Sequence, residues 1–470
     1  MKRIWIKDTP QFLDKEVMLC GWVNSRRDHG KIIFIDLRDR TGMVQLVFSP
    51  DKPEIYSKAD KLRSEWVVKI EGKVCSRPAG MENPKMETGK IEIEVSSLEI
   101  ITQSQVLPFD IYDDGKKIRE ELRLKYRYLD LRRKRMYKNM INRFRVIKFI
   151  RDYLSERDFI EIETPYLTKS TPEGARDYVV PSRLEPGKFY ALPQSPQQYK
   201  QLLMVAGIER YFQVVRCFRD EDTRGDRQPE FTQLDLEMDF PSQEDILELI
   251  ENLFKKLVEK LYPQKTISQF PFPRITYQEA MEKYNSDKPD LRKDKNNPDE
   301  LAFAFVVDFP LFEWKQEEQR WDAVHHPFTR PKFKQGESLE QLVQRLRKEP
   351  DKAVADQYDF VLNGYEVGGG SLRIYEPSLL ETIFEIMGHS KEAIHEKFGH
   401  LLEAFSYGVP PHGGIALGLD RIIMILENEP SIREVIAFPK TGDGRDLMMN
   451  APAEIEEEQL RELHLKIIKE

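Results

Sequence analysis

The stretch that decides the fold is CFRDEDTRGDRQPEFTQLDLEM, residues 217–238, which follows the apolar run RYFQVV at 210–215. Two strand-like runs around a charged loop predict a hairpin. Strand side chains alternate between two faces, so the outgoing strand has a polar-lined face and a mainly apolar face: Phe231, Gln233, Asp235 and Glu237 against Thr232, Leu234, Leu236 and Met238. A solvated surface hairpin is the simpler interpretation. One packed face and one face lined by amide and carboxylate groups favours a platform for a polar ligand, over which Arg219 would lean.

Composition and charge limit the kinds of protein this chain can be. Its 470 residues predict two or more domains, and its formal net charge of -8 gives no global attraction to nucleic acid. Between residues 116 and 145, however, thirteen Lys or Arg residues stand against three Asp or Glu. This basic run is either a solvated helix face or a local contact for a phosphate backbone, and the sequence leaves both interpretations open.

Cysteine usage and hydropathy indicate the compartment. Cys20, Cys75 and Cys217 are scattered and odd in number, so neither a disulfide framework nor a zinc site is expected. No signal-like N-terminus and no run of about 18 apolar residues is found. We therefore expect a cytoplasmic protein with no membrane partner.

Residues 16–102 resemble a run of about five short strands with one helical stretch, at 50–64, before the fourth. This order is typical of an OB-fold barrel, which often binds single-stranded nucleic acid. A lone Phe in a strand is more often a core residue, but beside Arg26 and Arg27 on such a barrel Phe34 is a candidate for stacking on an unpaired base, with Gln45 nearby. We predict an all-β domain at 1–104 and a hinge at 105–130.

The remaining residues, 131–470, mix helices and strands. Helical patterns cover 145–159 and 242–261, and strands are expected within 303–310, 358–375 and 413–421. The order predicts an α+β domain on a mainly antiparallel sheet. The polar segment 285–300 lacks periodicity and is expected to be a surface loop.

Several groups in this second part favour phosphate and cation binding. No glycine-rich phosphate loop is found, so phosphate would need other partners. Arg421, in GLDR, stands where a glycine-rich strand meets a helix, a position that favours phosphate, although an ordinary helix-starting Arg is the alternative. Asp359 and Glu366 could share a divalent cation. Three consecutive glycines, 368–370, indicate that another group approaches the strand closely.

Taken in order, these motifs resemble those of the class II aminoacyl-tRNA synthetases, and within them the aspartyl group of bacterial type. FIEIETPYL (159–167) is similar to motif 1, FRDED (218–222) with its return strand to motif 2, and GIALGLDRI (414–422) to motif 3. The signatures of the aspartyl group are matched by TPEGARDY (171–178), ALPQSPQQYK (191–200), HHPFT (325–329) and GGGSLRI (368–374). The resemblance covers nearly the whole chain and implies an OB-fold anticodon-binding domain and a class II catalytic domain.

The resemblance implies a ligase that activates L-aspartate with ATP and transfers it to tRNA. The attacking α-carboxyl has a pKa of about 3.3–3.7 and is ionised at pH 7, so the reaction needs positioning and charge stabilisation and no general base. Arg219 and Arg421 are the implied catalytic residues, and Glu366 with Asp359 would hold Mg2+. The residues implied to bind ATP are Arg219, Asp220, Glu221, Gln228, Glu366, Gly418, Leu419, Asp420 and Arg421.

The same resemblance implies how aspartate and tRNA are recognised. L-aspartate would be bound by Glu173, Gln197, Lys200, Arg219, Asp235, His325 and Arg373. Lys200 and Arg373 would bind the side-chain carboxylate, and asparagine would be rejected by about 10⁴ to 10⁵ because a neutral amide leaves buried charge unmatched. The residues implied at the anticodon are Arg27, Phe34 and Gln45.

Two further features of the sequence narrow the predicted domain structure and tRNA specificity. The extra domain that bacterial members carry between motifs 2 and 3 is missing near 285–301, which indicates a trimmed catalytic domain spanning 131–470. His29 in RRDHG and Gly80 in RPAG resemble forms that charge both tRNA-Asp and tRNA-Asn. The alternatives are a strictly discriminating enzyme and a catalytically silent tRNA-binding relative. A homodimer built through motif 1 is also expected.

Overall fold

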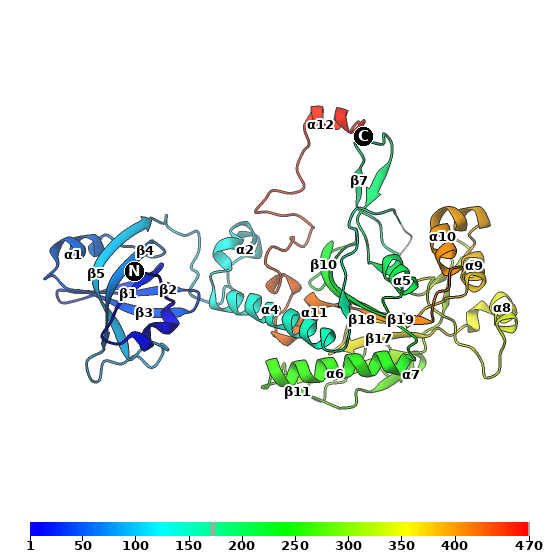
Figure 1. Cartoon of the computed structure of the whole chain (residues 1–470), viewed down its shortest axis with the longest axis horizontal. Helices are drawn as coiled ribbons and strands as arrows, with labels where there is room; N and C mark the ends of the chain where they lie inside the picture. The colour runs from blue at the N-terminus through cyan, green and yellow to red at the C-terminus, as the bar shows by residue number, and fades with distance from the viewer. Residues whose placement is uncertain (171–173, 469–470) are drawn as a thin grey trace. The chain divides into compact units, whose positions relative to one another are not determined.

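The computed structural model describes residues 1–170 and 174–468 (Figure 1). The chain divides into two compact units, Met1–Asp110 and Ile111–Glu470. Residues 111–130, predicted as part of a hinge, cluster with the second unit. None of the described helices is both long and apolar enough to cross a membrane.

The first unit is a closed barrel. Its strands are β1 (Glu16–His29), β2 (Ile32–Asp39), β3 (Gly42–Phe48), β4 (Val67–Ser76) and β5 (Ile91–Thr102), in the order β1-β2-β3-β5-β4, with η1 (Ile6–Phe12) before them and α1 (Pro53–Asp60) between β3 and β4. Ile33, Ile35 and Leu37 alternate along β2 and are buried in the barrel core. The predicted OB fold, with its helix before the fourth strand, is confirmed.

The second unit is built on an eight-stranded sheet. In sheet order its strands are β12 (Arg274–Thr276), β14 (Phe303–Val307), β17 (Gln357–Leu362), β18 (Tyr365–Leu372), β19 (His412–Gly418), β10 (Glu230–Asp239), β9 (Arg210–Phe218) and β6 (Ile160–Glu161). Neighbouring strands are antiparallel except for the two outermost pairs, β12 with β14 and β6 with β9. The predicted α+β domain on a mainly antiparallel sheet is confirmed.

Three helices, α4 (Lys134–Ser155), α6 (Gln243–Leu261) and α11 (Leu419–Leu426), fill one face of this sheet. Their apolar side chains share one core with inward-facing strand residues such as Leu234, Leu236 and Ile415. Helix α6 begins with a capping box between Ser242 and Asp245 and runs along the sheet in Figure 1. Because the helices occupy this face, Gln233 and Asp235 of β10 lie on the other.

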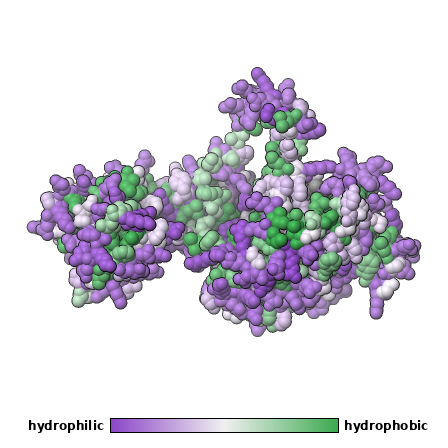
Figure 2. Space-filling model, viewed as in Figure 1, coloured by the Kyte–Doolittle hydropathy of each residue, from purple (hydrophilic) through white to green (hydrophobic). Residues whose placement is uncertain are grey.

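The other elements connect and flank the sheet. The helices are α2 (Glu120–Lys125), α3 (Arg127–Asp130), α5 (Gln197–Val205), α7 (Tyr277–Tyr284), α8 (Leu339–Lys348), η2 (Pro350–Lys352), α9 (Pro377–Ile386), α10 (Lys391–Phe405), η3 (Ile432–Glu434) and α12 (Glu457–Glu462), and the short strands are β7 (Val179–Pro181), β8 (Phe189–Ala191), β11 (Thr266–Ile267), β13 (Glu300–Leu301), β15 (Phe312–Lys315) and β16 (Arg320–Ala323). Residues 285–299, between α7 and β13, form neither helix nor strand and are mostly exposed, as predicted for a surface loop. Hydrophilic residues cover most of the surface seen in Figure 2.

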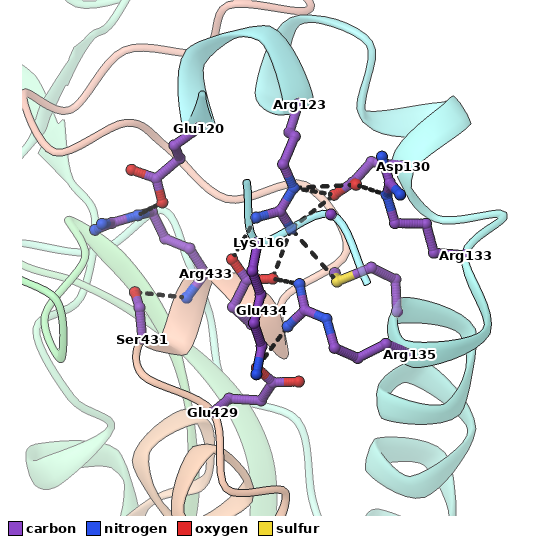
Figure 3. A network of polar contacts seen from close by, with 12 residues as sticks. Lys116, Glu120, Arg123, Asp130, Arg133, Arg135, Glu429, Ser431, Arg433 and Glu434 are labelled. Carbon is purple, nitrogen blue, oxygen red and sulfur yellow. Dashed lines mark hydrogen bonds and ion pairs between the residues drawn. The ribbon is translucent and has the colours of Figure 1, made fainter. Parts of the chain in front are cut away.

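The basic run at 116–145 has a different role from either predicted one. Arg123, Arg127 and Arg133 are buried around the carboxylate of Asp130, to which they donate at 2.9, 2.8 and 2.7 Å (Figure 3). Both interpretations, a solvated helix face and a phosphate contact, are wrong for these three side chains, because all three are buried and already paired with Asp130.

Candidate active site

The hairpin that opened the sequence analysis has the predicted two faces. Strands β9 and β10 pair from Arg210 opposite Met238 to Phe218 opposite Glu230. Leu234 and Leu236 lie in the core, whereas Gln233 and Asp235 line a cavity on the opposite face. The alternation in FTQLDLEM therefore predicted correctly which face of the strand packs in the core, and the opposite face lines a cavity.

The cavity has a volume of about 280 Å³ and draws its walls from distant parts of the chain. Strands β10, β17, β18 and β19, helix α5 and the loop after β9 all contribute to it. The predicted site residues that line it are Gln197, Lys200, Arg219, Glu221, Gln228, Asp235, His325, Asp359, Glu366, Arg373, Gly418, Asp420 and Arg421. Residues proposed from separate motifs thus meet around one space.

Four buried charged side chains lie at one part of this cavity. Nζ of Lys200 donates to Asp235 at 2.8 Å and lies 3.2 Å from Glu237. Nε and Nη2 of Arg373 donate to the two carboxylate oxygens of Glu237 at 2.9 and 3.1 Å. Each of the four is at most 2% exposed. We call these residues the substrate cluster; its two cations balance its two carboxylates.

The two carboxylates of the substrate cluster differ in their electrostatics. Burial raises the pKa of Asp235, and Lys200 offsets this only in part. Burial acts in the same direction on Glu237, but Arg373 and Lys200 outweigh it and lower the pKa of that carboxyl. Oδ1 of Asp235 has no hydrogen-bond partner within the described part of the chain. Glu237 is therefore the anion that holds both cations, and Asp235 has a spare acceptor that fits a ligand ammonium.

Two arginines on the cavity wall are held by different means. Arg219 lies 5.2 Å from the ring centroid of Phe231 and donates to the carbonyl of Gln194 at 3.4 Å. Arg421 donates to the carbonyls of Asp226 and Glu366 at 3.0 and 2.8 Å, and Nη2 lies 3.2 Å from the Asp226 carboxylate. No carboxylate lies within 4 Å of Arg219 among residues 1–170 and 174–468, so its charge can act on a bound anion.

Asp359 and Glu366 lie on neighbouring strands, β17 and β18, beside His325. Nε2 of His325 is 3.5 Å from Asp359, and Gln357 donates to the other oxygen of that carboxylate at 3.0 Å. Burial, followed by repulsion from Asp359, raises the pKa of Glu366. Carboxylate oxygens are the ligands that Mg2+ prefers, and a cation between these two groups would relieve their repulsion. The residues fit a magnesium ion with two protein ligands; within the described residues no cluster of three or more ligand side chains is found.

The three consecutive glycines are explained by close approach, as predicted. A Cβ on Gly368 would lie 2.3 Å from the side chain of Leu417, and one on Gly370 would lie 2.2 Å from the carbonyl oxygen of Gly414. Strand β18 therefore packs against β19 only without side chains at these positions. The glycine strand also forms part of the cavity wall, through Gly368 and Gly369.

Three predicted site residues stand apart from the cavity or are otherwise engaged, and a fourth is not described. Asp220 does not line it, and the side chain of Leu419 is buried in the core, so only the backbone of Leu419 could meet a ligand. Asp420 borders the cavity, but its carboxylate accepts from a side-chain nitrogen of Arg143 at 2.5 Å and a backbone N–H at 2.9 Å. Glu173 lies outside the described residues.

Three further residues join the site without having been predicted. Nη1 of Arg373 lies 2.8 Å from Nε2 of His326, whose pKa is lowered strongly by burial and by Arg373, so the ring is neutral and accepts this bond. Asp226 holds Arg421, and Gln357 orients Asp359. Gln357 could have been found, because it shares a strand face with Asp359 two residues on.

The residues predicted to meet an anticodon lie together on the barrel. Arg27 stands opposite Phe34 across β1 and β2, and it donates to Gln45 at 3.2 Å. Phe34 is partly exposed, and Gln45 is buried and donates to Glu92. His29 and Gly80 are both exposed, and Gly80 has a φ of +79°.

Comparison with known proteins identifies both units. Residues 119–442 match the family of tRNA synthetases class II (D, K and N), and residues 17–101 match an OB-fold nucleic acid binding domain. A relative from Rubrobacter xylanophilus, named aspartate–tRNA(Asp/Asn) ligase, is 44% identical over 96% of this chain and 94% of its own. One of the same name from Thermodesulfovibrio yellowstonii is 42% identical over 97% of each chain. The first alignment has 576 positions, so at least 106 of them have no counterpart among the 470 residues here.

Solved structures show the same fold. Asparaginyl-tRNA synthetase from Pyrococcus horikoshii, complexed with asparaginyl-adenylate, matches with a TM-score of 0.74 and 24% identity over 94% of this chain and 98% of that one. A putative aspartyl-tRNA synthetase from Leishmania major matches with a TM-score of 0.74 and 21% identity over 93% and 94%. With its catalytic motifs gathered around one cavity and a barrel unit before them, the chain belongs to the class II tRNA synthetases of the D, K and N group.

Proposed function

We propose that this chain is an aspartate–tRNA ligase that forms aspartyl-adenylate from L-aspartate and ATP and then transfers aspartate to tRNA. The observation that carries the proposal is the pair of buried cations, Lys200 and Arg373, beside the spare acceptor of Asp235. Relatives named aspartate–tRNA(Asp/Asn) ligase, similar over nearly the full chain, support the same reaction.

Aspartate fits the substrate cluster through its charges. Its side-chain carboxylate would lie between Lys200 and Arg373, its ammonium on Oδ1 of Asp235, with Gln197 and His325 on the surrounding wall. Glu237 keeps the two cations in place before the substrate arrives. Asparagine lacks the carboxylate that Lys200 and Arg373 would bind, and such a mismatch discriminates by about 10⁴ to 10⁵.

Activation then requires positioning more than proton transfer. An oxygen of the ionised α-carboxylate attacks the α-phosphorus of ATP, and pyrophosphate leaves with the electron pair of the broken P–O bond. Arg219 would hold the reacting groups and Arg421 the terminal phosphate, because both guanidinium groups line the cavity. Glu366 and Asp359 would hold magnesium, which supplies positive charge to the phosphate oxygens.

Gln228 and Glu221 are candidates for binding the adenine of ATP. Gln228 is buried at the cavity wall, and its Oε1 accepts from the backbone N–H of Lys440 at 2.7 Å. Its Nε2 has no partner within the described residues, so it can donate to a ring nitrogen of the base. Glu221, which also lines the cavity, lies 3.3 Å from Arg227. These two residues would orient the nucleoside.

Transfer completes the reaction when a terminal ribose hydroxyl of tRNA attacks the aspartyl carbonyl and AMP leaves. Arg27 and Phe34 would contact the anticodon, since they stand opposite each other on one barrel face and supply a cation and a partly exposed ring, and the buried Gln45 would hold Arg27 in place. His29 and Gly80 support the charging of both tRNA-Asp and tRNA-Asn. Those anticodons differ in one base, and one base contact is worth about 1–3 kcal/mol. A homodimer and a cytoplasmic location stay predictions.

ATP–pyrophosphate exchange and aspartylation test these assignments. Exchange should require aspartate and magnesium and should be absent with asparagine or lysine. Transcripts of tRNA-Asp and tRNA-Asn should be aspartylated at comparable rates; a gap of about a thousandfold, equivalent to about 4 kcal/mol, would indicate a discriminating enzyme. No exchange with any of the three amino acids would favour a silent tRNA-binding protein.

A further inference from the structure

Residues 429–437, which we call the strap, follow α11 and are clamped by the basic run. Glu434 accepts from Nη1 and Nη2 of Arg123 at 3.0 and 2.7 Å and from Arg135 at 2.8 Å (Figure 3). Arg135 also donates to Glu429 at 2.5 Å. Burial opposes ionisation of Glu434, but Arg123 and Arg135 outweigh it and lower the pKa of the carboxyl. The carboxylates of Glu429 and Glu434 therefore attach the strap to the basic run at two points.

The backbone of the strap is held by the same run. The guanidinium of Arg127, which is 2% exposed, donates to the carbonyls of Arg433, Ile436 and Ala437 at 2.5, 2.9 and 2.9 Å. One buried side chain therefore fixes three carbonyls within five residues. Such multiple contacts leave this backbone little freedom to shift.

On its other side the strap holds the loop after β9. Oγ of Ser431 and the backbone N–H of Ile432 both donate to the carbonyl of Gly225, at 2.8 and 3.0 Å. Nη1 of Arg433 donates to the carbonyl of Arg224 at 3.4 Å. Ile432 also lines the cavity. The position of Gly225 is therefore set by the strap.

Asp226, the residue after Gly225, contacts Arg421 on the cavity wall. Asp226 holds Arg421 through its carbonyl, at 3.0 Å, and its carboxylate, at 3.2 Å. A displaced loop would move both acceptors and leave the guanidinium held by the carbonyl of Glu366. A group that must meet a phosphate gains from being held before the ligand binds.

We propose that the strap positions the residues that would bind ATP. The arginines of the basic run hold residues 429–437, the strap in turn fixes Gly225, and through Asp226 it positions Arg421. Ser431 is the positioning residue, because its side chain joins strap to loop without lining the cavity. The proposal rests on the proposed function. It adds a route by which residues outside the cavity affect the affinity of the enzyme for ATP.

Replacing Ser431 tests this directly in the full-length enzyme. Ser431→Ala should raise KM for ATP about threefold to tenfold, the factor for losing the hydrogen bond to Gly225, and leave KM for aspartate within about twofold. Aspartate is spared because Lys200 and Arg373 do not depend on the loop. Ser431→Thr keeps the hydroxyl and should restore KM for ATP.

A matched control separates positioning from general destabilisation. Oγ of Ser268 makes one hydrogen bond, to Glu300 at 2.7 Å, whereas Oγ of Ser431 donates to Gly225 and also accepts from the backbone N–H of Arg433 at 3.2 Å; neither serine lines the cavity. Ser268→Ala should lower the unfolding midpoint as Ser431→Ala does but leave both KM values unchanged. In addition, Ser431→Ala combined with Asp226→Asn should raise KM for ATP by less than the product of the two single effects.

Two results would overturn the proposal: an unchanged KM for ATP in Ser431→Ala, or equal increases in KM for ATP and for aspartate. Failure of the proposed function is a different observation, because it would show as no aspartate-dependent exchange in the unaltered enzyme.

Discussion

Two buried clusters of charge in the second unit invite comparison. The substrate cluster comprises Lys200, Asp235, Glu237 and Arg373, and a scaffold cluster comprises Arg123, Arg127, Asp130, Arg133 and Glu434. Both are almost wholly buried. The first lines a cavity and has an unpartnered oxygen, on Asp235, whereas the second neither lines the cavity nor contains a buried atom without a partner in the described residues. Buried charge alone does not identify a site; a buried carboxylate oxygen without a partner, on a residue that lines a cavity, favours one.

The largest expected effect tests the substrate cluster. Lys200→Met or Arg373→Leu should reduce aspartate-dependent ATP–pyrophosphate exchange by at least about 10³-fold, because the substrate carboxylate loses a buried cation and Glu237 loses a partner. Initial rates of exchange measure this.

Lys265 offers the matched control for Lys200. Its buried ammonium lies 3.2 Å from Asp299 and 2.7 Å from Asn428, away from the cavity. Lys265→Met should lower the unfolding midpoint and retain exchange. Near-normal exchange in Lys200→Met or Arg373→Leu would refute the role of the substrate cluster.

The next largest effect compares Asp130 of the scaffold cluster with Asp235 of the substrate cluster. Burial opposes ionisation of Asp130, but Arg123 and the neighbouring arginines outweigh it and lower its pKa, whereas the pKa of Asp235 is raised. Asp130→Asn should therefore reduce the free energy of unfolding by about 3–5 kcal/mol, since three buried arginines lose their common partner. Asp235→Asn should cost less stability but raise KM for aspartate. Urea unfolding of both variants measures the difference; equal losses would contradict the contrast.

The smallest effect concerns Asp239, which shares β10 with Asp235 and Glu237 but has no cation partner among the described residues. Burial, with Glu209 and Glu237 nearby, raises the pKa of Asp239 to about 7, above the unfolded value of about 3.9. The protonated form is thus favoured by the fold, and its contribution is fully available below pH 3.9 and is lost as pH rises through about 7. Asp239→Asn does not titrate and should be more stable than the natural protein by about 1–2 kcal/mol at pH 8, allowing for solvent screening of a half-exposed group.

The pH dependence is the readout for Asp239. The advantage of Asp239→Asn in urea unfolding should grow between about pH 4 and pH 7 and then level off. The same advantage at pH 5 and at pH 8 would show that Asp239 is ionised throughout this range in the folded protein.

The local pattern of polar and apolar residues was sufficient to predict much of the fold. Alternation in FTQLDLEM predicted which face of β10 is buried, and strand spacing predicted the barrel with its helix before the fourth strand. The motifs predicted which side chains carry the site, and most of those that the structure describes line one cavity. Residues whose partners are distant were not predicted: Asp226 gains its role from Arg421, which lies 195 positions away.

The sequence by itself determined the class of the protein, because side-chain periodicity and motif chemistry are local properties that survive without coordinates. Only the tertiary structure decided what the charges do. Arg123 and Arg373 are both arginines in charged stretches, yet one is neutralised by Asp130 and Glu434 in a closed cluster and the other faces a cavity. The physical reason is that the energy of a buried charge depends on which opposite charges lie within a few ångströms, and Arg123 meets Glu434 across 311 positions of chain.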